Sequence, residues 1–273
     1  MIDRDTLLVT LSDLHSGGTT ALFPDRFAQF SDGSNHVQNS TQQRIYAHFL
    51  ECAESVLAAR KDKRLIIVHN GDAIEGDHHA SQQIRPRERS DQIDIHCELI
   101  VLFKRLVDFH NGDKLYYTLG TETHTTNAEN VIGEKLGAVQ DDDDLYVFKE
   151  LKLDINGKRF WFVHHGPTRG KGANRGNTMR NWLKHIFYDL VAENMEPPHY
   201  IITGHVHDPD WGDYIGRLDG QYHKIEGLIC PSWQQKTRYG YGVSPFVRGK
   251  VGLHHITVAA GGEIGDPVEL IMK

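Results

Sequence analysis

The segment Leu65-Ile66-Ile67-Val68-His69-Asn70-Gly71-Asp72 decides the fold class of this chain. Its apolar run, residues 65–68, predicts a strand, and the Asn-Gly-Asp that follows predicts a turn at the end of that strand. Residues 41–60 before it and 91–110 after it carry apolar side chains at helical spacing, and Ser40 or Thr41 is expected to cap the first helix. A strand between two amphipathic helices predicts a layered α/β fold.

The rest of the chain continues this alternation of short apolar runs and longer amphipathic segments. Strands are expected at residues 6–12, 115–119 and 200–203, and helices at 127–136 and 177–194. The turn Asn156-Gly157 predicts a hairpin of residues 146–155 and 159–163. From Trp211 onward the pattern is mostly β, with turns at Asp219-Gly220 and Gly261-Gly262. Because no segment has the composition of a linker, we expect one domain, residues 1–273.

The composition excludes several classes of protein. Of the 273 residues, 25% are charged and 39% hydrophobic, which is unlike a disordered or fibrous chain. No apolar run approaches the ~18 residues of a membrane span, and the N-terminus lacks a signal-peptide pattern. The three cysteines, Cys52, Cys97 and Cys230, are far apart, which indicates reduced thiols without a Cys-based zinc site. We therefore expect a cytoplasmic location and no membrane partner.

Two numbers in the composition bear on function: the net charge and the histidine count. The net charge of −7 is unlike that of a protein whose whole surface attracts nucleic acid. The 18 histidines are the unusual number, and many of them stand beside Gly or Asp.

Five short segments share one design, because each follows an apolar strand and each ends in residues that bind metals. They are Ser12-Asp13-Leu14-His15, Asn70-Gly71-Asp72, Gly120-Thr121-Glu122-Thr123-His124, Val163-His164-His165-Gly166 and Gly204-His205-Val206-His207. Segments at the carboxyl ends of strands in an α/β sheet meet in one crevice. Strand alternation predicts that Asp13 and His15 share a face, and the glycines are expected to allow sharp turns.

The residue types in these segments predict the metals. Imidazoles and carboxylates without cysteine suit divalent Mn, Fe, Zn or Ni. The set is too large for one ion, so Asp72, in the middle, is expected to be shared between two.

Taken in order, the five segments resemble the calcineurin-like metallophosphoesterases. The motifs of that family run D-x-H, G-D, G-N-H-[DE], H-G and G-H-x-H, and they correspond here to the stretch from Asp13 to His207. The G-T-E-x-H variant is similar to the small phosphoesterases of phages and prophages. The resemblance implies a four-layer α/β/β/α fold, with mixed β-sheets flanked by helices. It also implies phosphoester hydrolysis by a binuclear metal centre and a metal-activated hydroxide.

The resemblance further implies roles for individual residues. A first metal would be held by Asp13, His15 and His207, with Asp72 shared. A second would be held by His205 and His165, with His164 as the alternative to His165.

The third segment departs from the family pattern. The asparagine that the family uses as a ligand is absent from Gly120-Thr121-Glu122-Thr123-His124. Glu122 is expected to supply a carboxylate oxygen in its place, with Asn127 as a remote alternative. His124 matches the family histidine in type, and the resemblance implies that it is the general acid for the leaving group.

Basic residues follow the second, fourth and fifth segments, and their charge predicts an anionic substrate. Arg169 and Arg175 follow the fourth segment, and they are expected to bind substrate together with His78. Other basic residues, Lys236, Arg238, Arg248 and Lys250, alternate with aromatic ones near the C-terminus. If these loops converge, they form a basic, aromatic rim suited to a polyanion; the alternative is that they are ordinary solvated loops.

These observations predict a hydrolase of phosphoester bonds, with a nucleic acid or nucleotide phosphodiester as its substrate. One alternative is a phosphomonoesterase acting on a protein or a small molecule. The other is a metal-binding, nucleic-acid-binding protein with little catalysis. The sequence sets neither the metal identity nor the oligomeric state.

Overall fold

The computed structural model describes residues 4–27, 29–77, 83–125, 127–170, 172–238 and 249–273. In this part of the chain the first of two sheets has the strand order β10-β9-β1-β2-β3. Strands β1, β2 and β3 run parallel, and β9 is antiparallel to both β1 and β10. The bounds are β1 (Thr6–Leu11), β2 (Arg64–Asn70), β3 (Lys114–Thr118), β9 (Gly252–Val258) and β10 (Val268–Ile271).

The second sheet has the order β4-β5-β6-β8-β7. Strands β5, β6 and β8 are parallel, while β4 and β7 pair antiparallel with their neighbours. The bounds are β4 (Leu151–Ile155), β5 (Lys158–Phe162), β6 (Tyr200–Thr203), β7 (Asp210–Leu218) and β8 (Gln221–Ile229). The expected hairpin turn at Asn156-Gly157 is present between β4 and β5, and Asp219-Gly220 joins β7 to β8.

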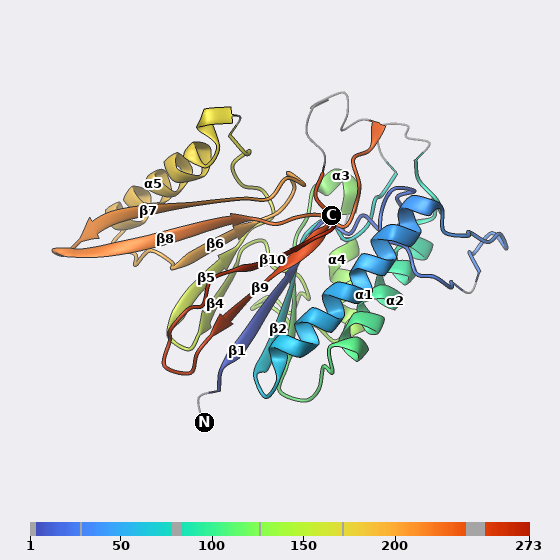
Figure 1. Cartoon of the computed structure of the whole chain (residues 1–273), viewed down its shortest axis with the longest axis horizontal. Coiled ribbons are helices and arrows are strands. Elements are labelled where there is room, and N and C mark those ends of the chain that lie inside the picture. The colour runs from blue at the N-terminus through green and yellow to red at the C-terminus, as the bar shows by residue number, and fades with distance from the viewer. Residues whose placement is uncertain (1–3, 28, 78–82, 126, 171, 239–248) are drawn as a thin grey trace.

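Helices cover the outer faces of both sheets, as Figure 1 shows. Helices α1 (Ser40–Arg60), α2 (Arg89–Leu106) and α4 (Ala128–Leu136) pack on the first sheet. Helix α5 (Asn177–Ala192) packs on the second. The order helix, sheet, sheet, helix confirms the four-layer α/β/β/α fold.

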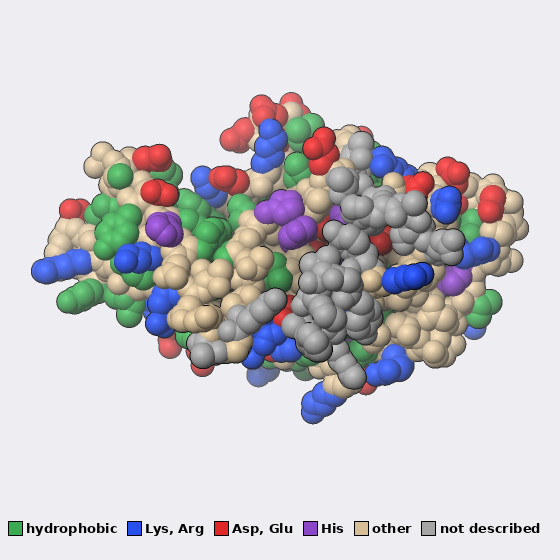
Figure 2. All heavy atoms as spheres, turned by 90° about the horizontal axis from the view of Figure 1, so that it is seen from above, with side chains coloured by type: hydrophobic (Ala, Val, Ile, Leu, Met, Phe, Trp, Pro, Cys, Tyr) green, Lys and Arg blue, Asp and Glu red, His purple; other side chains and the backbone are tan. Residues whose placement is uncertain are grey.

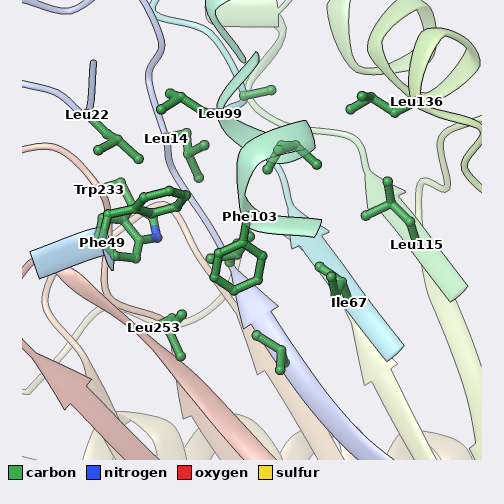
Figure 3. Close-up of a cluster of buried hydrophobic side chains, with 14 of the residues drawn as sticks. Leu14, Leu22, Phe49, Ile67, Leu99, Phe103, Leu115, Leu136, Trp233 and Leu253 are labelled. Atoms are coloured by element: carbon green, nitrogen blue, oxygen red, sulfur yellow. The ribbon is translucent and has the colours of Figure 1, made fainter. Parts of the chain in front are cut away.

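Each pair of neighbouring layers has its own apolar core. Between α1, α2 and the first sheet lie Phe49, Phe103 and Trp233, all buried (Figure 3). Between the two sheets lie Leu8 from the first sheet and Phe160 and Phe162 from the second. Because both faces of each sheet are covered, the central strands read as unbroken apolar runs in the sequence.

Helix α1 begins one residue before the expected start, and its cap differs from the prediction. Asn39, rather than Ser40 or Thr41, is the N-cap: its side chain accepts a hydrogen bond from the Gln42 backbone N–H at 3.0 Å. The Gln42 side chain in turn accepts from the Asn39 backbone N–H at 3.2 Å. This reciprocal pair satisfies two helix donors at once, which Ser40 or Thr41 in the same place cannot do with Gln42.

The strand ends converge as predicted. The Asp13 backbone N–H donates to the Gly71 carbonyl at 3.0 Å, which joins the ends of β1 and β2. The Gly204 N–H donates to the His164 carbonyl at 2.9 Å, which joins the ends of β6 and β5. The His205 N–H donates to the Asp13 carboxylate and connects the two sheets. Within the described residues, no helix is both long and apolar enough to cross a bilayer.

A buried polar cluster lies between β2, α2 and β3, behind these strand ends. The rings of His69 and Tyr117 stack with centroids 5.0 Å apart, and His96 meets His69 edge-on. His96 donates from Nδ1 to the Ala73 carbonyl at 3.0 Å, and its Nε2 lies 3.0 Å from the Tyr117 hydroxyl. Burial lowers the pKa of His96 to about 4, and it holds the pKa of His69 well below the usual value.

This cluster predicts loss of stability in acid. Since the unfolded chain binds a proton at His96 near pH 6.5 and the folded chain only near pH 4, stability falls as the pH drops through that window. The His96→Gln variant should therefore lose less free energy of unfolding between pH 7 and pH 5, by about 2 kcal/mol. Urea unfolding of both proteins at both pH values measures the difference. Equal losses in the two proteins would contradict the assignment.

Candidate metal centre

The first group of possible ligands joins the ends of β1 and β6. The Nε2 atoms of His15 and His207 lie 3.1 Å apart. Asp13 Oδ1 lies 3.1 Å from His207 Nε2 and 3.8 Å from His15 Nε2. Ligands about 2.1 Å from one divalent ion are spaced roughly 3–3.5 Å apart, so these three atoms suit one ion. The residues are the three that the sequence assigns to the first metal.

Asp72 lies beside this group and reaches a second one. Its Oδ2 is 3.8 Å from His15 Nε2 and 3.0 Å from His164 Nε2. The buried His164 Nε2 has no hydrogen-bond partner among the described residues, although its Nδ1 donates to the Asn70 carbonyl at 2.7 Å. A buried ring nitrogen without a hydrogen bond, aimed at carboxylates, has the environment of a metal ligand. The position of Asp72 also suits the predicted shared role.

A third group joins β5 and β6 and contains both members of the His-His pair. Ligand atoms of His164, His165 and His205 all lie within 4.8 Å of one another. His164 is buried, whereas His165 and His205 are exposed. The sequence preferred His165 over His164, but it is His164 that contacts Asp72, at 3.0 Å.

Five of these residues have an unusual backbone. The φ angles of Asp13, His15, Asp72, His205 and His207 lie between 46° and 68°, in the left-handed region. Side chains other than glycine rarely adopt this conformation, and it concentrates at functional sites. Asp13 and His15 therefore share the site because the chain turns after β1, and not through strand alternation, which the sequence had suggested.

The glycines of the segments serve packing more than turning. Of Gly71, Gly120, Gly166 and Gly204, positive φ is found at Gly71 alone. A Cβ at Gly120 would collide with the Asp72 backbone nitrogen, and one at Gly166 with the Thr203 side chain. At Gly204 it would collide with Ser12 Oγ and lie 2.8 Å from Asp13 Oδ2. Glycine is therefore favoured by its backbone conformation at Gly71, and at the other three positions because it allows close approach of the strand ends.

Adding one methyl group at Gly204 is expected to destabilise the protein. The Gly204→Ala change forces Ser12 and Asp13 apart, and overpacking of this kind costs about 1–3 kcal/mol. The matched control is Gly261→Ala, because a Cβ there meets nothing within 4 Å. Thermal unfolding should show a lower melting temperature for the first variant alone. Equal melting temperatures would show that the strand ends have room to relax.

The electrostatics keep the two carboxylates ionised. Burial would raise the pKa of Asp13, but the charges of His207 and His164 hold that pKa well below its usual value. Asp72 behaves alike: burial opposes ionisation, and the contact with His164 lowers its pKa. Burial lowers the pKa values of His165 and His205, so both rings stay neutral at pH 7. Burial opposes protonation of His15 and His164, but the carboxylates around them raise both pKa values, that of His164 to about 9. A cation bound there would therefore displace a proton from each of these two rings.

The third segment is arranged differently from the prediction. Glu122 begins the short helix α3 (Glu122–Thr125), is exposed, and belongs to none of the ligand groups found among the described residues. Thr121 takes the inner position instead: its N–H donates to Asp72 Oδ1 at 2.6 Å. Its hydroxyl lies 3.2 Å from both Asp72 Oδ2 and His205 Nδ1. Thr121 therefore ties the shared carboxylate to the second group.

His124 reaches the centre from the same helix. Its Nδ1 donates to the Glu75 carbonyl at 2.8 Å, and its ring lies 4.8 Å from that of His15. His15, Asp72 and His124 form a further group with ligand atoms within 4.8 Å. Because Nδ1 is occupied, Nε2 is the nitrogen that remains for chemistry at the site.

Sequence reasoning missed Glu75, which supports two site histidines. Its Oε2 lies 3.1 Å from His15 Nδ1 and accepts a hydrogen bond from Gln234 Nε2 at 2.6 Å. Its backbone carbonyl holds His124. A carboxylate on Nδ1 orients a ligand histidine and leaves Nε2 for the metal. The available signal was the position of Glu75 three residues after Asp72, inside a stretch that also suits a solvated loop.

The predicted substrate residues Arg169 and Arg175 form ion pairs with acidic residues that follow His207. Arg169 pairs with Asp208 through Nη1, and Arg175 Nε donates to Asp210 Oδ1 at 3.0 Å. Both arginines thus anchor the loop after His207. His78 and residues 239–248 of the expected aromatic rim lie outside the described residues. Figure 2 views the molecule from above relative to Figure 1 and shows histidines near the middle of that face, with acidic and basic side chains around them.

Comparisons with known proteins give loose similarity only. No family model matches the chain, and neither does any curated protein. A predicted phosphoesterase from Streptococcus pneumoniae TIGR4 aligns at 10% identity and a TM-score of 0.32, over 98% of each chain. NAD nucleotidase from Haemophilus influenzae aligns at 11% identity and a TM-score of 0.42, over 98% of this chain and 50% of that one. Chaetomium thermophilum Vps29 aligns at 8% identity and a TM-score of 0.32, over 98% of each chain. None of these alignments assigns a function to this chain.

Proposed function

We propose that this protein is a metal-dependent hydrolase of phosphoester bonds, of the calcineurin-like type that its motifs resemble. The observation that carries the proposal is the position of Asp72, whose Oδ2 stands between His15 Nε2 at 3.8 Å and His164 Nε2 at 3.0 Å. An ionised carboxylate between two sets of imidazoles suits two cations that share one ligand.

The ligand assignment follows from the groups described above. Asp13, His15 and His207 would hold one divalent ion, with Asp72 shared. His164 and His205 would hold the other, with His165 beside them. We prefer His164 to His165 because its buried Nε2 lies 3.0 Å from Asp72 Oδ2. Two such ions lower the pKa of bound water and neutralise phosphoryl oxygens.

The remaining side chains position groups and move protons. In its protonated form, His124 holds one proton on Nδ1 for the Glu75 carbonyl and presents the other on Nε2 to the leaving oxygen. Glu75 and the Asn70 carbonyl fix the tautomers of His15 and His164, so that each ring turns Nε2 toward the site. Thr121 replaces the family asparagine as a positioning residue for Asp72 and His205.

Within this class we propose a nucleotide or nucleic acid phosphodiester as substrate. A phosphomonoester carries up to two negative charges and needs more cationic side chains around it than a monoanionic diester does. Arg169 and Arg175 are neutralised by Asp208 and Asp210, which leaves less free positive charge beside the site. This charge balance favours a singly charged phosphodiester group over a phosphomonoester, and the nucleotide or nucleic acid part of the proposal rests on the sequence alone.

The test compares bis-p-nitrophenyl phosphate with p-nitrophenyl phosphate, using protein stripped of metal and refilled with manganese. We expect turnover of the diester that requires metal and is abolished in Asp13→Asn. The control is Asp62→Asn, which removes an exposed carboxylate. Turnover of the monoester alone would favour a phosphatase. Manganese binding without turnover of either compound, or of DNA, RNA and cyclic nucleotides, would favour the metal-binding, nucleic-acid-binding alternative.

The single domain of residues 1–273, the phage or prophage type and the cytoplasmic location stay predictions from the sequence. So does the choice among Mn, Fe, Zn and Ni.

A further inference from the structure

Strand β7 is the longest edge strand in the described part of the chain. The two sheets end in β10, β3, β4 and β7, and these strands have four, five, five and nine residues. Figure 1 shows β7 and β8 running out past the rest of the second sheet. Long, regular edges are templates for pairing with another chain, and proteins usually shorten or interrupt them. No proline interrupts β7, and all nine of its residues pair in register with β8.

The register fixes which backbone groups of β7 face outward. Leu218 pairs with Gln221 across the turn Asp219-Gly220, whose φ angles are 49° and 82°. This two-residue turn makes Leu218 and Gln221 a hydrogen-bonded pair, so even-numbered residues of β7 bond to β8. The N–H and C=O groups of residues 211, 213, 215 and 217 therefore point away from β8. In agreement, the Asp213 carbonyl accepts a hydrogen bond from Arg180 Nε at 3.2 Å, from outside the sheet.

The side chains on this edge are self-complementary about Ile215. An antiparallel copy centred there would place Ile215, which is 57% exposed, against its own counterpart. Asp213 would lie opposite Arg217 of the second copy, and Arg217 opposite Asp213, which forms two ion pairs. On the other face, Tyr214 and Gly216 already pack against Phe187 of α5, so that face stays covered by its own helix. In this register Trp211 lies opposite the turn residue Asp219 of the second copy, so the outward side chains that pair are those of residues 213, 215 and 217.

For such pairing Arg180 must release the Asp213 carbonyl, and the two side chains that would form the ion pairs make only long contacts. Arg217 is exposed and donates from Nε to the Gly220 carbonyl at 3.3 Å, within its own hairpin. The Asp213 carboxylate lies 3.5 Å from Arg180 and 3.8 Å from Lys224, which are long contacts for ion pairs. Trp211, which is 48% exposed, lies on the same face as Ile215 and widens its apolar surface.

We propose that the protein forms a two-fold dimer in which β7 pairs antiparallel with β7 of a second copy, centred on Ile215. The two second sheets then form one continuous ten-stranded sheet. One strand pair with its side chains is a small interface, so the dimer should dissociate in the micromolar range. Isologous pairing uses the same residues on both copies, so one substitution removes each contact of the substituted residue twice.

The test exchanges the two charges and measures mass by sedimentation equilibrium between 1 and 200 μM protein. Arg217→Asp and Asp213→Arg should each weaken the dimer at least tenfold, because like charges then face each other. The double variant, Asp213→Arg with Arg217→Asp, should recover dimerisation, since opposite charges meet again. A wild-type protein that is monomeric throughout would overturn the proposal. Failure of the double variant to recover would overturn the register.

A backbone variant gives an independent test. Ile215→Pro removes an N–H that faces away from β8, so the hairpin itself loses no hydrogen bond. Ile215→Thr is the matched control, because it keeps that N–H and the strand propensity. We expect the proline variant to be monomeric and the threonine variant to dimerise, with both retaining the wild-type circular dichroism spectrum. A dimer that survives the proline change would mean that another surface forms it.

Discussion

Asp72→Asn should reduce turnover of the phosphodiester about 1,000-fold or more. Asparagine keeps the size of the side chain and can still accept the Thr121 N–H, so the fold is preserved. It lacks the negative charge that stands between His15 and His164. Loss of that charge weakens both cation sites at once, and a 1,000-fold change corresponds to about 4 kcal/mol in the barrier.

The measurement is kcat for bis-p-nitrophenyl phosphate together with metal content after dialysis. Asp94→Asn is the control, since Asp94 is an exposed carboxylate that pairs with Lys135. We expect the control to match the wild type and Asp72→Asn to retain less metal. If turnover of Asp72→Asn is within tenfold of wild type, Asp72 takes no essential part in the reaction.

The second large effect separates His164 from His165. His164→Ala should lower turnover about 100-fold or more, because it removes a buried Nε2 that lies 3.0 Å from Asp72 Oδ2. A residue that only orients a ligand costs 10–100-fold when removed, and a ligand itself should cost more. His165→Ala should cost less than tenfold, because that ring is exposed at the edge of the group.

Both variants are compared by turnover and by calorimetric titration with manganese. Thermal unfolding monitors the fold, because His164 also donates to the Asn70 carbonyl. His164→Asn serves as a second variant of smaller volume change. A larger loss of turnover in His165→Ala than in either His164 variant would restore the order that the sequence preferred.

The strands and the convergence of their ends were predictable because helices cover the outer face of each sheet and the other sheet covers its inner face. Runs such as Leu65–Val68 must then be apolar throughout, and they stand out in the sequence. The polar residues directly after such runs had to lie at the carboxyl edge. Asp13, His15, Asp72, His205 and His207 were identified in this way.

Other features depend on contacts that no local pattern encodes. Glu75 meets Gln234, which lies 159 residues away, and both are buried beside His15. The pairing of Arg169 with Asp208 joins two loops across 39 residues and removes a charge that the sequence had assigned to substrate. Asp13 and His15 adopt a left-handed backbone where β1 ends against β2 and β6. Strand periodicity predicted that the two side chains share one site, but the cause is the turn after β1.

Because the ligand groups come from both sheets, cation binding and folding are linked. Asp13, His15 and Asp72 follow strands of the first sheet, and His164, His205 and His207 follow strands of the second. A cation held by both sets would join the two sheets, and its binding free energy would add to the free energy of unfolding. At a free concentration of 100 times Kd this contributes about 2.7 kcal/mol per site. If the proposed cations bind, the resistance of the chain to heat would depend on the trace-metal supply of its surroundings as well as on its apolar cores.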